Sequence, residues 1–267
     1  MPEGPEVKRL VCFLETFSGK TLSEVEILSG RYRKHGPFEG YSSLVKKLPS
    51  KIKTVSCKGK FIYFSFFDGT SLWCTLGMSG TWLKSQRKHS RVRFRVDNTD
   101  VWFDDVRNFG TLKFANSPDE LKKKLSTLGH DPLVEDIDCI KLNRLVSRKT
   151  HKTISEILMD QKVFAGVGNY LKSEILYASK VSPHRTYETL TRDEVSSICY
   201  NTNRIMKLSF DSGGATILTY RDENGDPGSF SRRFAVYGQK EDPLGHCVIK
   251  ETTRDRRTTH WVPGIQV

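Results

Sequence analysis

Apolar and polar residues follow two different patterns in the first part of the chain. Apolar residues recur at helical spacing from Val7 to Phe17, which predicts one helix directly after the opening residues MPEGP. Between about residues 20 and 115, short runs such as FIYFSFF, SLWCTLGM and RVRFRV alternate and predict β-strands. Asp68-Gly69 and the run from Asn98 to Asp100 favour tight turns between such strands. This region is therefore predicted to be an antiparallel β sandwich or barrel.

The pattern becomes helical after about residue 117. The segment PDELKKKLSTLG opens with proline and acidic residues, as helices do. Further amphipathic segments lie at about residues 138–147, 152–160, 169–179 and 191–210. The last residues alternate again, and they predict a β-hairpin with one basic strand.

Together the patterns predict an α+β chain: an amino-terminal antiparallel β sandwich, a helical domain and a carboxy-terminal β-hairpin. The predicted domains are residues 1–130, 131–234 and 235–267, and the first linker is placed within residues 128–137. The stretch GGATILTYRDENGDPGSFSRR near the end of the helical part is rich in glycine and polar residues, which predicts a long loop.

The charge balance is strongly basic. The chain has 43 Lys and Arg against 31 Asp and Glu, a formal net charge of +12, which suits a polyanion but also fits a merely basic protein. No apolar run approaches the roughly 18 residues that a membrane span needs, and no signal-peptide pattern is present. The six cysteines are scattered without a C-x-x-C pair, so reduced thiols are expected. We therefore expect an intracellular, soluble protein with no membrane partner.

The opening residues MPEGPEV carry candidate chemistry. Met1 is expected to be removed because the second residue is small, which would give Pro2 a free amine. An α-amino group titrates near pH ~8, and the positive end of a helix disfavours its protonated form further. Such an amine attacks an aldehyde-like sugar carbon, and a carboxylate such as Glu3 beside it can donate and remove protons. Proline followed by acidic residues is also ordinary helix capping, which is the competing explanation.

The segment FAGVGNYLKSEILY is a second candidate site. Gly166, Gly168 and Asn169 form a turn ahead of apolar residues at helical spacing. Bare backbone amides and the Asn169 side chain are expected to point outward at this helix start, which is a phosphate-binding arrangement. Most glycine-rich helix starts merely cap the helix, so this pattern by itself predicts little.

Six segments carry a family resemblance. They are MPEGPEV, KGKF, LGMSG, DDVRNFG, MDQKVFAGVGNYLKSEILY and the final VYG with RRTTHW. Their order and spacing resemble those of the Fpg/Nei DNA glycosylases, the formamidopyrimidine-DNA glycosylase and endonuclease VIII family, over essentially the whole chain. The resemblance implies a monomeric, bifunctional base-excision repair enzyme that needs no cofactor. It also implies a β sandwich, a helix-two-turn-helix domain and a finger that grip damaged DNA, duplex or single-stranded, between them.

The resemblance also implies catalytic roles. Pro2 is expected to attack C1′ of a flipped-out nucleotide, with Glu3 as the proton donor that opens the sugar and Glu6 as a supporting carboxylate. Lys60 in KGKF and Arg257 in RRTTHW are expected to hold the phosphates beside the lesion. Without the resemblance, Lys60 would be interpreted as a solvated lysine. The base leaves, an iminium links Pro2 to the sugar, and β and δ eliminations break the strand.

Further residues are expected to bind DNA. The resemblance implies that Met78, Arg107 and Phe109 fill the gap left by the flipped nucleotide, although Met78 and Phe109 could equally be core residues. The next position, Asn108, departs from the arginine that is frequent in the family. Asn169, with Gly168 before it, is expected to hold a phosphate.

Three residues of the carboxy-terminal part are weaker candidates for DNA contacts. Tyr237 in VYG offers a hydroxyl group, though such a tyrosine is more often a packing residue. Arg254 and Arg256 are expected to make general contacts with the DNA backbone or to be solvated charges.

The carboxy-terminal hairpin departs from many relatives, which have a four-cysteine zinc finger there. A structural zinc site needs four ligands, and this part of the chain offers only Cys247, with His246 and His260 nearby. We therefore predict no metal: a zincless finger in which Leu244, Val262 and Ile265 pack where the metal would lie. The animal endonuclease VIII-like enzyme and some viral and plant relatives have such fingers. Zinc bound by His246, Cys247 and His260 is the minor alternative.

The lesion is less defined than the chemistry. The resemblance places a lesion-recognition loop at Tyr220 to Arg233, and oxidised pyrimidines, formamidopyrimidines and hydantoins are the expected substrates. An enzyme that prefers 8-oxoguanine and an inactive lesion-binding paralogue remain alternatives. A non-catalytic DNA-binding module would have no use for Pro2 and Glu3 together. A tautomerase that uses an amino-terminal proline would be a much smaller chain.

Overall fold

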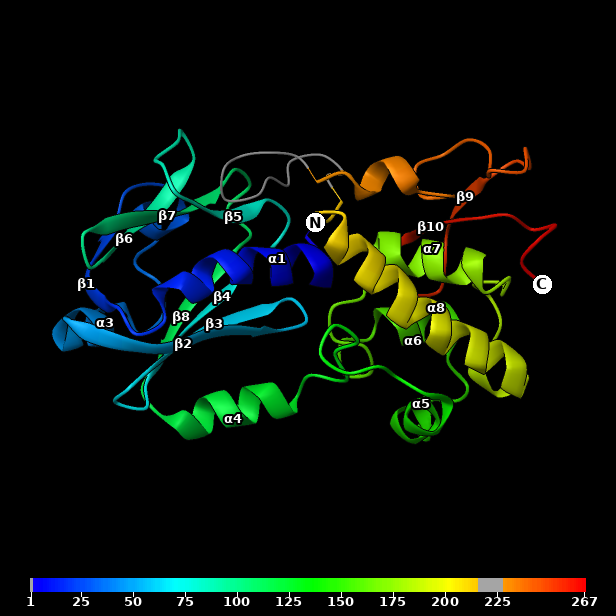
Figure 1. Ribbon diagram of the computed structural model, residues 1–267, viewed down its shortest axis with the longest axis horizontal. Helices are drawn as coiled ribbons and strands as arrows, with labels where there is room; N and C mark the ends of the chain where they lie inside the picture. Colours follow the sequence, from blue (N-terminus) through cyan, green and yellow to red (C-terminus); the bar gives the residue numbers. More distant parts are fainter. Residues whose placement is uncertain (1, 216–227) are drawn as a thin grey trace. The chain divides into compact units, whose positions relative to one another are not determined.

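The structure is a computed structural model that describes residues 2–215 and 228–267. The chain divides into two compact units. The β unit contains Pro2, Glu6–Thr127 and the described residues of Gly213–Ser229, and the helical unit contains Glu3–Pro5, Leu128–Ser212 and Phe230–Val267. The predicted α+β class, with strands first and helices afterwards, is confirmed (Figure 1).

Antiparallel strands form the β unit. Within its described residues, eight strands make one sheet in the order β5-β7-β6-β1-β2-β3-β4-β8. They are β1 Thr21–Ile27, β2 Ser50–Lys58, β3 Phe61–Phe66, β4 Ser71–Thr75, β5 Gly80–Leu83, β6 Ser90–Val96, β7 Thr99–Asp105 and β8 Thr111–Ala115. Their buried residues mostly alternate with less buried ones, as in β6, because successive side chains of a strand point to opposite faces.

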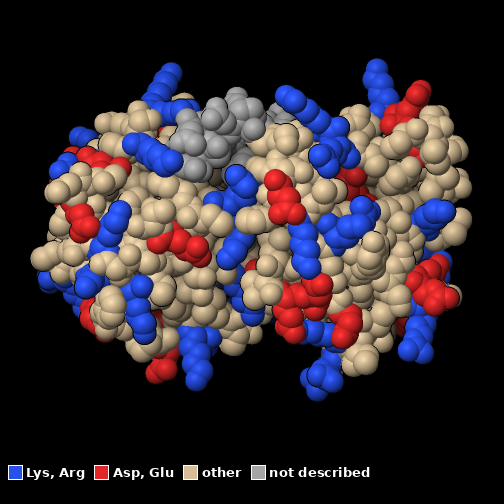
Figure 2. Space-filling view, viewed as in Figure 1, with Lys and Arg blue, Asp and Glu red and all other residues tan. Residues whose placement is uncertain are grey.

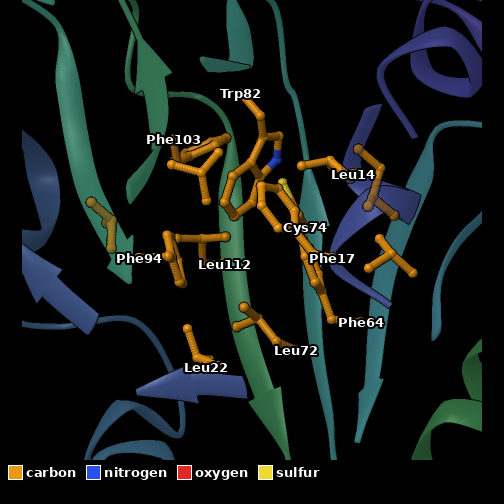
Figure 3. Close-up of a cluster of buried hydrophobic side chains, with 14 of the residues drawn as sticks. Leu14, Phe17, Leu22, Phe64, Leu72, Cys74, Trp82, Phe94, Phe103 and Leu112 are labelled. Atoms are coloured by element: carbon orange, nitrogen blue, oxygen red, sulfur yellow. The ribbon is translucent and has the colours of Figure 1, made fainter. Parts of the chain in front are cut away.

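The sheet closes over a single apolar core. Only two residue pairs, Thr21 with Lys51 and Leu22 with Ser50, join β1 to β2 and hence the two halves of the sheet. Trp82 of β5 packs against Phe64 of β3 at a ring distance of 5.3 Å and against Phe94 of β6 at 4.9 Å. The two halves therefore face each other as a sandwich, with Trp82 among the side chains of the core (Figure 3).

Helices complete the β unit. They are α1 Gly4–Leu14, the 3₁₀ turn Glu15–Phe17, α2 Arg31–Lys34, α3 Tyr41–Lys47 and α4 Pro118–Ser126. The apolar face of α1, which includes Leu14, belongs to the sandwich core (Figure 3). The sequence patterns predicted α1 and α4 but not α2 or α3. These two helices have 4 and 7 residues, too few for a helical period to stand out from the surrounding strands.

The helical unit contains the four predicted helices. They are α5 Cys139–Val146, α6 Ile154–Met159, α7 Asn169–Ala178 and α8 Arg192–Asp211. The starts of α5, α6 and α8 are fixed by capping: Asp138 accepts a hydrogen bond from the Lys141 amide, and Thr153 and Thr191 form capping boxes. Among the described residues, no helix is both long enough and apolar enough to cross a membrane.

Helix α7 is enclosed on almost every side. Its residues from Tyr170 to Leu176 are all buried, including the polar Lys172, Ser173 and Glu174. Buried polar groups are costly unless they are hydrogen-bonded or paired. The polar side chains of α7 must therefore have partners inside the helical unit.

The carboxy-terminal hairpin consists of β9 Ile249–Thr252 and β10 Thr258–Trp261. Val236, Val248 and Val262 form a small core beside it, with Ile265 packed against them. The expectation that Leu244 belongs to this core is wrong, because its side chain is 71% exposed. The reason is a turn in which the Asp242 carboxylate accepts hydrogen bonds from the amides of Leu244 and His246. This turn leaves Leu244 in solvent.

The metal ligands considered from the sequence do not form a cluster. His246 Nδ1 lies 3.0 Å from Asp242 Oδ2, Cys247 is exposed, and His260 is buried. No group of three or more His, Cys, Asp or Glu side chains in the described parts of the chain could hold a metal ion. The arrangement does not fit a zinc site, and the zincless finger stays a prediction.

Zinc removal tests this prediction. Prolonged dialysis against a strong chelator is expected to leave the thermal unfolding midpoint unchanged within about 1 °C, because packing around Val262 stabilises the hairpin instead of a metal. Elemental analysis of the purified protein should find far less than one zinc per chain. Stoichiometric zinc together with a lower midpoint after chelation would contradict the zincless finger.

Candidate active site

The Glu3 carboxylate lies at the amino end of α7. Its Oε1 accepts a hydrogen bond from the Tyr170 amide at 3.0 Å, and its Oε2 accepts one from the Leu171 amide at 3.3 Å. The residue is only 2% exposed. Backbone donors and the positive end of a helix both favour the ionised carboxylate. Glu3 is therefore held in a fixed orientation by two backbone amides.

Gly168 makes room for this carboxylate. A Cβ atom at this position would lie 2.3 Å from Glu3 Cδ, a distance that no side chain tolerates. A hydrogen bond of 2.8 Å from the Gly4 amide to the Gly166 carbonyl fixes the chain next to Glu3. The sequence predicted bare amides at this helix start. That prediction is wrong for Tyr170 and Leu171, whose amides already bind Glu3.

Asn169 faces the carboxy-terminal hairpin. Its Nδ2 donates to the Thr258 carbonyl at 2.7 Å, next to Arg257 in the chain. Its Oδ1 is buried and has no hydrogen-bond partner among the described residues. This amide therefore anchors the hairpin and leaves an acceptor beside the helix start.

Tyr237 lies beside Asn169 and Glu3. Burial raises the pKa of the Tyr237 phenol, the Asn169 side chain opposes the rise, and the negative charge of Glu3 adds to it. Its backbone is held by α7, because Glu174 accepts hydrogen bonds from the amides of Ala235, Val236 and Tyr237. Burial raises the pKa of Glu174, and the three amide donors counteract that rise.

The three candidate arginines of the hairpin lie on the turn between β9 and β10. Arg254, Arg256 and Arg257 are all exposed. Arg256 adopts a left-handed conformation with φ of 61°, and Arg254 Nε lies 3.7 Å from Glu156 Oε2. The turn thus presents cationic side chains at the end of a hairpin that α7 holds.

In the β unit, Met78, Arg107 and Phe109 lie on two adjacent loops. Met78 is half-buried in the turn before β5, and the Phe109 side chain is 54% exposed. The Arg107 guanidinium lies 4.9 Å from the centre of the Phe109 ring. Gly77 brings the two loops together, since a Cβ there would lie 2.6 Å from the Phe109 carbonyl carbon. Met78 and Phe109 are therefore loop residues, not core residues.

Asp105 ties these two loops to each other. Its carboxylate is 1% exposed and accepts hydrogen bonds from the Ser79 hydroxyl at 2.6 Å and from the Gly110 amide at 2.7 Å. The Arg107 amide donates to the same Ser79 hydroxyl at 2.9 Å. One buried carboxylate thus fixes the backbone of the two loops that carry Met78, Arg107 and Phe109.

Asn108, the position that departs from the family pattern, has a backbone role. Its φ is 57°, a left-handed conformation that asparagine tolerates better than most residues. Its Oδ1 accepts a hydrogen bond from the Arg31 amide at 3.4 Å and lies where a Cβ of Gly30 would be. The substitution is therefore accommodated by the loop between β1 and α2.

Glu6 and Lys60 lie elsewhere in the β unit. Glu6 is 1% exposed, and its Oε1 accepts a hydrogen bond from the Ala215 amide at 2.7 Å. Lys60 lies in the turn between β2 and β3, after Gly59 with a φ of 58°. Most of the predicted lesion-recognition loop, Tyr220 to Arg233, falls within residues 216–227 and lies outside the described residues.

The structure thus forms two groups of predicted residues. The helical unit brings Glu3, Gly168, Asn169 and Tyr237 together and holds the hairpin that carries Arg257. The β unit brings Met78, Arg107 and Phe109 together and contains Pro2, Glu6 and Lys60 separately. The sequence interpretation missed the residues that hold these groups, namely Ser79, Asp105, Lys172, Glu174 and Asp255. The motifs DDVRNFG and LKSEILY contained three of the five, Asp105, Lys172 and Glu174, and LGMSG contained Ser79, but nothing in the sequence marked these as buried.

Three family profiles match the chain in series. They are the formamidopyrimidine-DNA glycosylase N-terminal domain at residues 1–112, its H2TH domain at residues 128–221 and its C-terminal domain at residues 228–267. Formamidopyrimidine-DNA glycosylases of an Exiguobacterium species and of Bacillus cereus are each 31% identical to the chain, covering 100% of it and 99% of the relative. The chain belongs to the formamidopyrimidine-DNA glycosylase family.

Solved structures agree with this family. The MutM (Fpg) protein of Thermus thermophilus has a TM-score of 0.86 at 28% identity, covering 99% of this chain and 98% of that one. A Lactococcus lactis Fpg mutant in complex with DNA that contains Fapy-dG has a TM-score of 0.86 at 26% identity, covering 99% of each chain. The resemblance inferred from the six motifs is confirmed, and the chain is a DNA glycosylase of base-excision repair.

The charges alone do not locate the DNA-binding surface. On the face shown in Figure 2, Lys and Arg side chains are scattered, and Asp and Glu side chains lie between them. Basic side chains attract DNA from a distance but do not place it. The contacts must therefore be assigned to individual residues such as those above.

His260 is a buried histidine next to this site. It is 8% exposed, its ring centre lies 4.7 Å from that of Tyr237, and its Nδ1 has no hydrogen-bond partner among the described residues. Burial, together with the charges of Lys250 and Lys172, lowers the pKa of His260 from 6.5 to about 4. His260 is neutral in the folded protein at neutral pH.

Because of His260, we expect the stability of the folded protein to fall in acid. Between pH ~4 and pH ~6.5, His260 is protonated in the unfolded chain but neutral in the folded protein. The free energy of unfolding therefore falls as pH falls through this window. The loss is on the order of 3 kcal/mol and is absent above pH ~6.5. Urea unfolding at pH 7 and pH 4.5 should show that His260→Phe loses less stability on acidification than the native chain. The exposed His35, changed to Gln, serves as the control; an equal acid effect in all three proteins would refute the prediction.

Proposed function

We propose that the protein is a bifunctional DNA glycosylase and abasic-site lyase that excises oxidised bases through an iminium at Pro2, followed by β and δ elimination. The observation that carries the proposal is the Glu3 carboxylate, fixed by two backbone amides of α7 at the residue directly after Pro2. Family membership supports both activities.

The fixed Glu3 carboxylate suggests how the reaction begins. Once Met1 is removed, the Pro2 amine is a secondary ammonium in its protonated form. Transfer of its proton to the adjacent Glu3 carboxylate yields a neutral nucleophile and a carboxylic acid in one step. Glu3 thus serves as the proposed acceptor of the Pro2 proton.

The later steps balance with the same two groups. The Pro2 nitrogen bonds to C1′, its remaining proton leaves with the damaged base, and the Glu3 acid protonates O4′ as the ring opens and the iminium forms. The resulting iminium acidifies the C2′ proton, whose removal expels the 3′ phosphate, and a second elimination expels the 5′ phosphate. Water then hydrolyses the iminium and releases Pro2.

Residues on the two units are proposed to hold DNA. Arg257 offers its guanidinium to phosphate oxygens, with Arg254 and Arg256 making weaker contacts. The exposed ring of Phe109, with Arg107 over it and Met78 on the adjacent turn, is suited to fill the space of a flipped nucleotide.

The proposed substrates are formamidopyrimidines, oxidised pyrimidines and hydantoins in damaged DNA. Support comes from Lactococcus lactis Fpg, whose structures include complexes with DNA containing Fapy-dG and with DNA containing an oxidised pyrimidine. An 8-oxoguanine preference is the alternative specificity, and excision assays on the separate lesions decide between them.

Trapping with borohydride tests the nucleophile. On a duplex with one abasic site, the native protein should form a covalent adduct, and mass spectrometry should place it on Pro2 with Met1 absent. Glu3→Gln should still bind this DNA but excise a damaged base at least about 100-fold more slowly, since it cannot relay a proton. No adduct despite confirmed removal of Met1 and tight binding would indicate an inactive, lesion-binding paralogue.

Substitution of Phe109 tests its proposed role in filling the space of the flipped nucleotide. Phe109→Ala should lower kcat/KM on duplex DNA by about 5- to 100-fold, because base stacking on an aromatic ring contributes about 1–3 kcal/mol. Cleavage of a single-stranded abasic site, which needs no such filling, should change less than about threefold. Phe67→Ala removes another exposed phenylalanine of the β unit, 62% exposed, and should change neither rate. Equal losses on both substrates would argue against this role.

A further inference from the structure

Lys172 is a buried lysine to which the mechanism above gives no role. It lies in the middle of α7, its side chain is 0% exposed, and its Nζ lies 2.6 Å from Asp255 Oδ2. The Asp255 side chain is 3% exposed. Removing two charges from water costs several kcal/mol per ion, and the attraction between them seldom does more than offset that cost. The pair is therefore poorly explained by stability alone.

Asp255 organises the turn that carries Arg257. While its Oδ2 pairs with Lys172, its Oδ1 accepts hydrogen bonds from the Thr253 hydroxyl and from the Arg257 amide at 3.4 Å. The Thr253 amide donates to the Arg257 carbonyl at 3.1 Å and closes the turn. The Asp255 carboxylate thus fixes the backbone conformation of the turn at Arg257.

The same face of α7 holds the hairpin on the other side of Arg257. Asn169 donates to the Thr258 carbonyl at 2.7 Å, and the Ser173 hydroxyl accepts a hydrogen bond from the His260 amide at 3.3 Å. Positions 169, 172 and 173 share one face of a helix. Arg257 therefore lies between two points at which α7 fixes the hairpin backbone.

The electrostatic surroundings of Lys172 connect both ends of this arrangement. Burial lowers the pKa of Lys172, Asp255 and Glu3 oppose that effect, and Arg257 adds to it. The lysine thus interacts with the proposed proton carrier and with the proposed phosphate ligand at the same time. Replacing it would alter the charge between them.

We propose that Lys172 is a positioning residue that, through Asp255, holds the Arg257 guanidinium in place for one DNA phosphate. The proposal rests on the role given above to Arg257. A buried ion pair suits this task, since its partners must meet in one geometry for the attraction to offset the cost of burial. If the pair served stability alone, apolar residues could replace it without any effect on DNA binding.

The test compares the native chain with Lys172→Met/Asp255→Leu, which removes both charges and leaves neither unpaired. Binding to a duplex with a tetrahydrofuran abasic analogue is measured as a function of salt, with and without Arg257→Ala. Each phosphate contact adds about 0.9 to the slope of log affinity against log salt for duplex DNA. Thermal unfolding and circular dichroism establish that each variant is folded.

The expected result is that the double variant loses about 0.9 of this slope and that Arg257→Ala then weakens binding no further. In the native background, Arg257→Ala alone should weaken binding about tenfold or more. A folded double variant with the native slope, in which Arg257→Ala costs as much as in the native chain, would overturn the proposal. If the double variant does not fold, Asp255→Asn, which keeps Oδ1 as an acceptor, is measured in its place.

Two controls separate the possible failures. Lys207→Met/Asp136→Leu removes an ion pair of the same N–O distance, 2.6 Å, whose side chains are 54% and 59% exposed, and it should keep the native slope. If Arg257→Ala keeps the native slope in the native chain, Arg257 holds no phosphate and the positioning proposal falls with it. Borohydride trapping at Pro2 would still occur in that case, so the lyase function would stand.

Discussion

The contact between the Glu3 carboxylate and the first amides of α7 is the interaction on which the rest of the helical unit depends. It requires a glycine at position 168, because a Cβ would occupy the space of the carboxylate. It also requires that α7 begin deep inside the unit, so the helix is buried around most of its circumference. The polar side chains of α7 then need internal partners, and they find them in the carboxy-terminal hairpin and in the segment Ala235–Tyr237 before it. One helix therefore positions both Glu3 and the turn that is proposed to hold DNA.

The two units use the same physical device. Asp105 in the β unit and Glu174 in the helical unit are buried carboxylates that accept hydrogen bonds from backbone amides of functional loops. Glu6 does so at Ala215, just before the segment that the structure does not describe. A carboxylate can bind several amides at once, and such charge-assisted hydrogen bonds are stronger than neutral ones. The loops are consequently fixed at their backbones while their exposed side chains remain available for DNA.

The sequence predicted the helices and strands better than it predicted the side-chain contacts between distant parts of the chain. The four helices after residue 138 were placed within two residues, since their apolar spacing and capping residues are local signals. The quoted motifs also supplied the candidate site residues, whose roles stay predictions. Lys172 and Glu174 could not be interpreted, because polar residues on a helix normally indicate a solvent face and their partners lie 83 and 61 or more positions away. Leu244 was misplaced for a similar reason: the side-chain hydrogen bonds of Asp242 decide that turn.

The use of backbone amides at the start of α7 has an evolutionary consequence. Every amino acid except proline supplies the same N–H group at positions 170 and 171, so drift at these positions leaves the contact with Glu3 intact. No other residue can replace the carboxylate of Glu3 without changing its length or charge, and no larger residue fits at Gly168. This contact therefore constrains the identity of one acid and one glycine, which are 165 positions apart by their numbers 3 and 168.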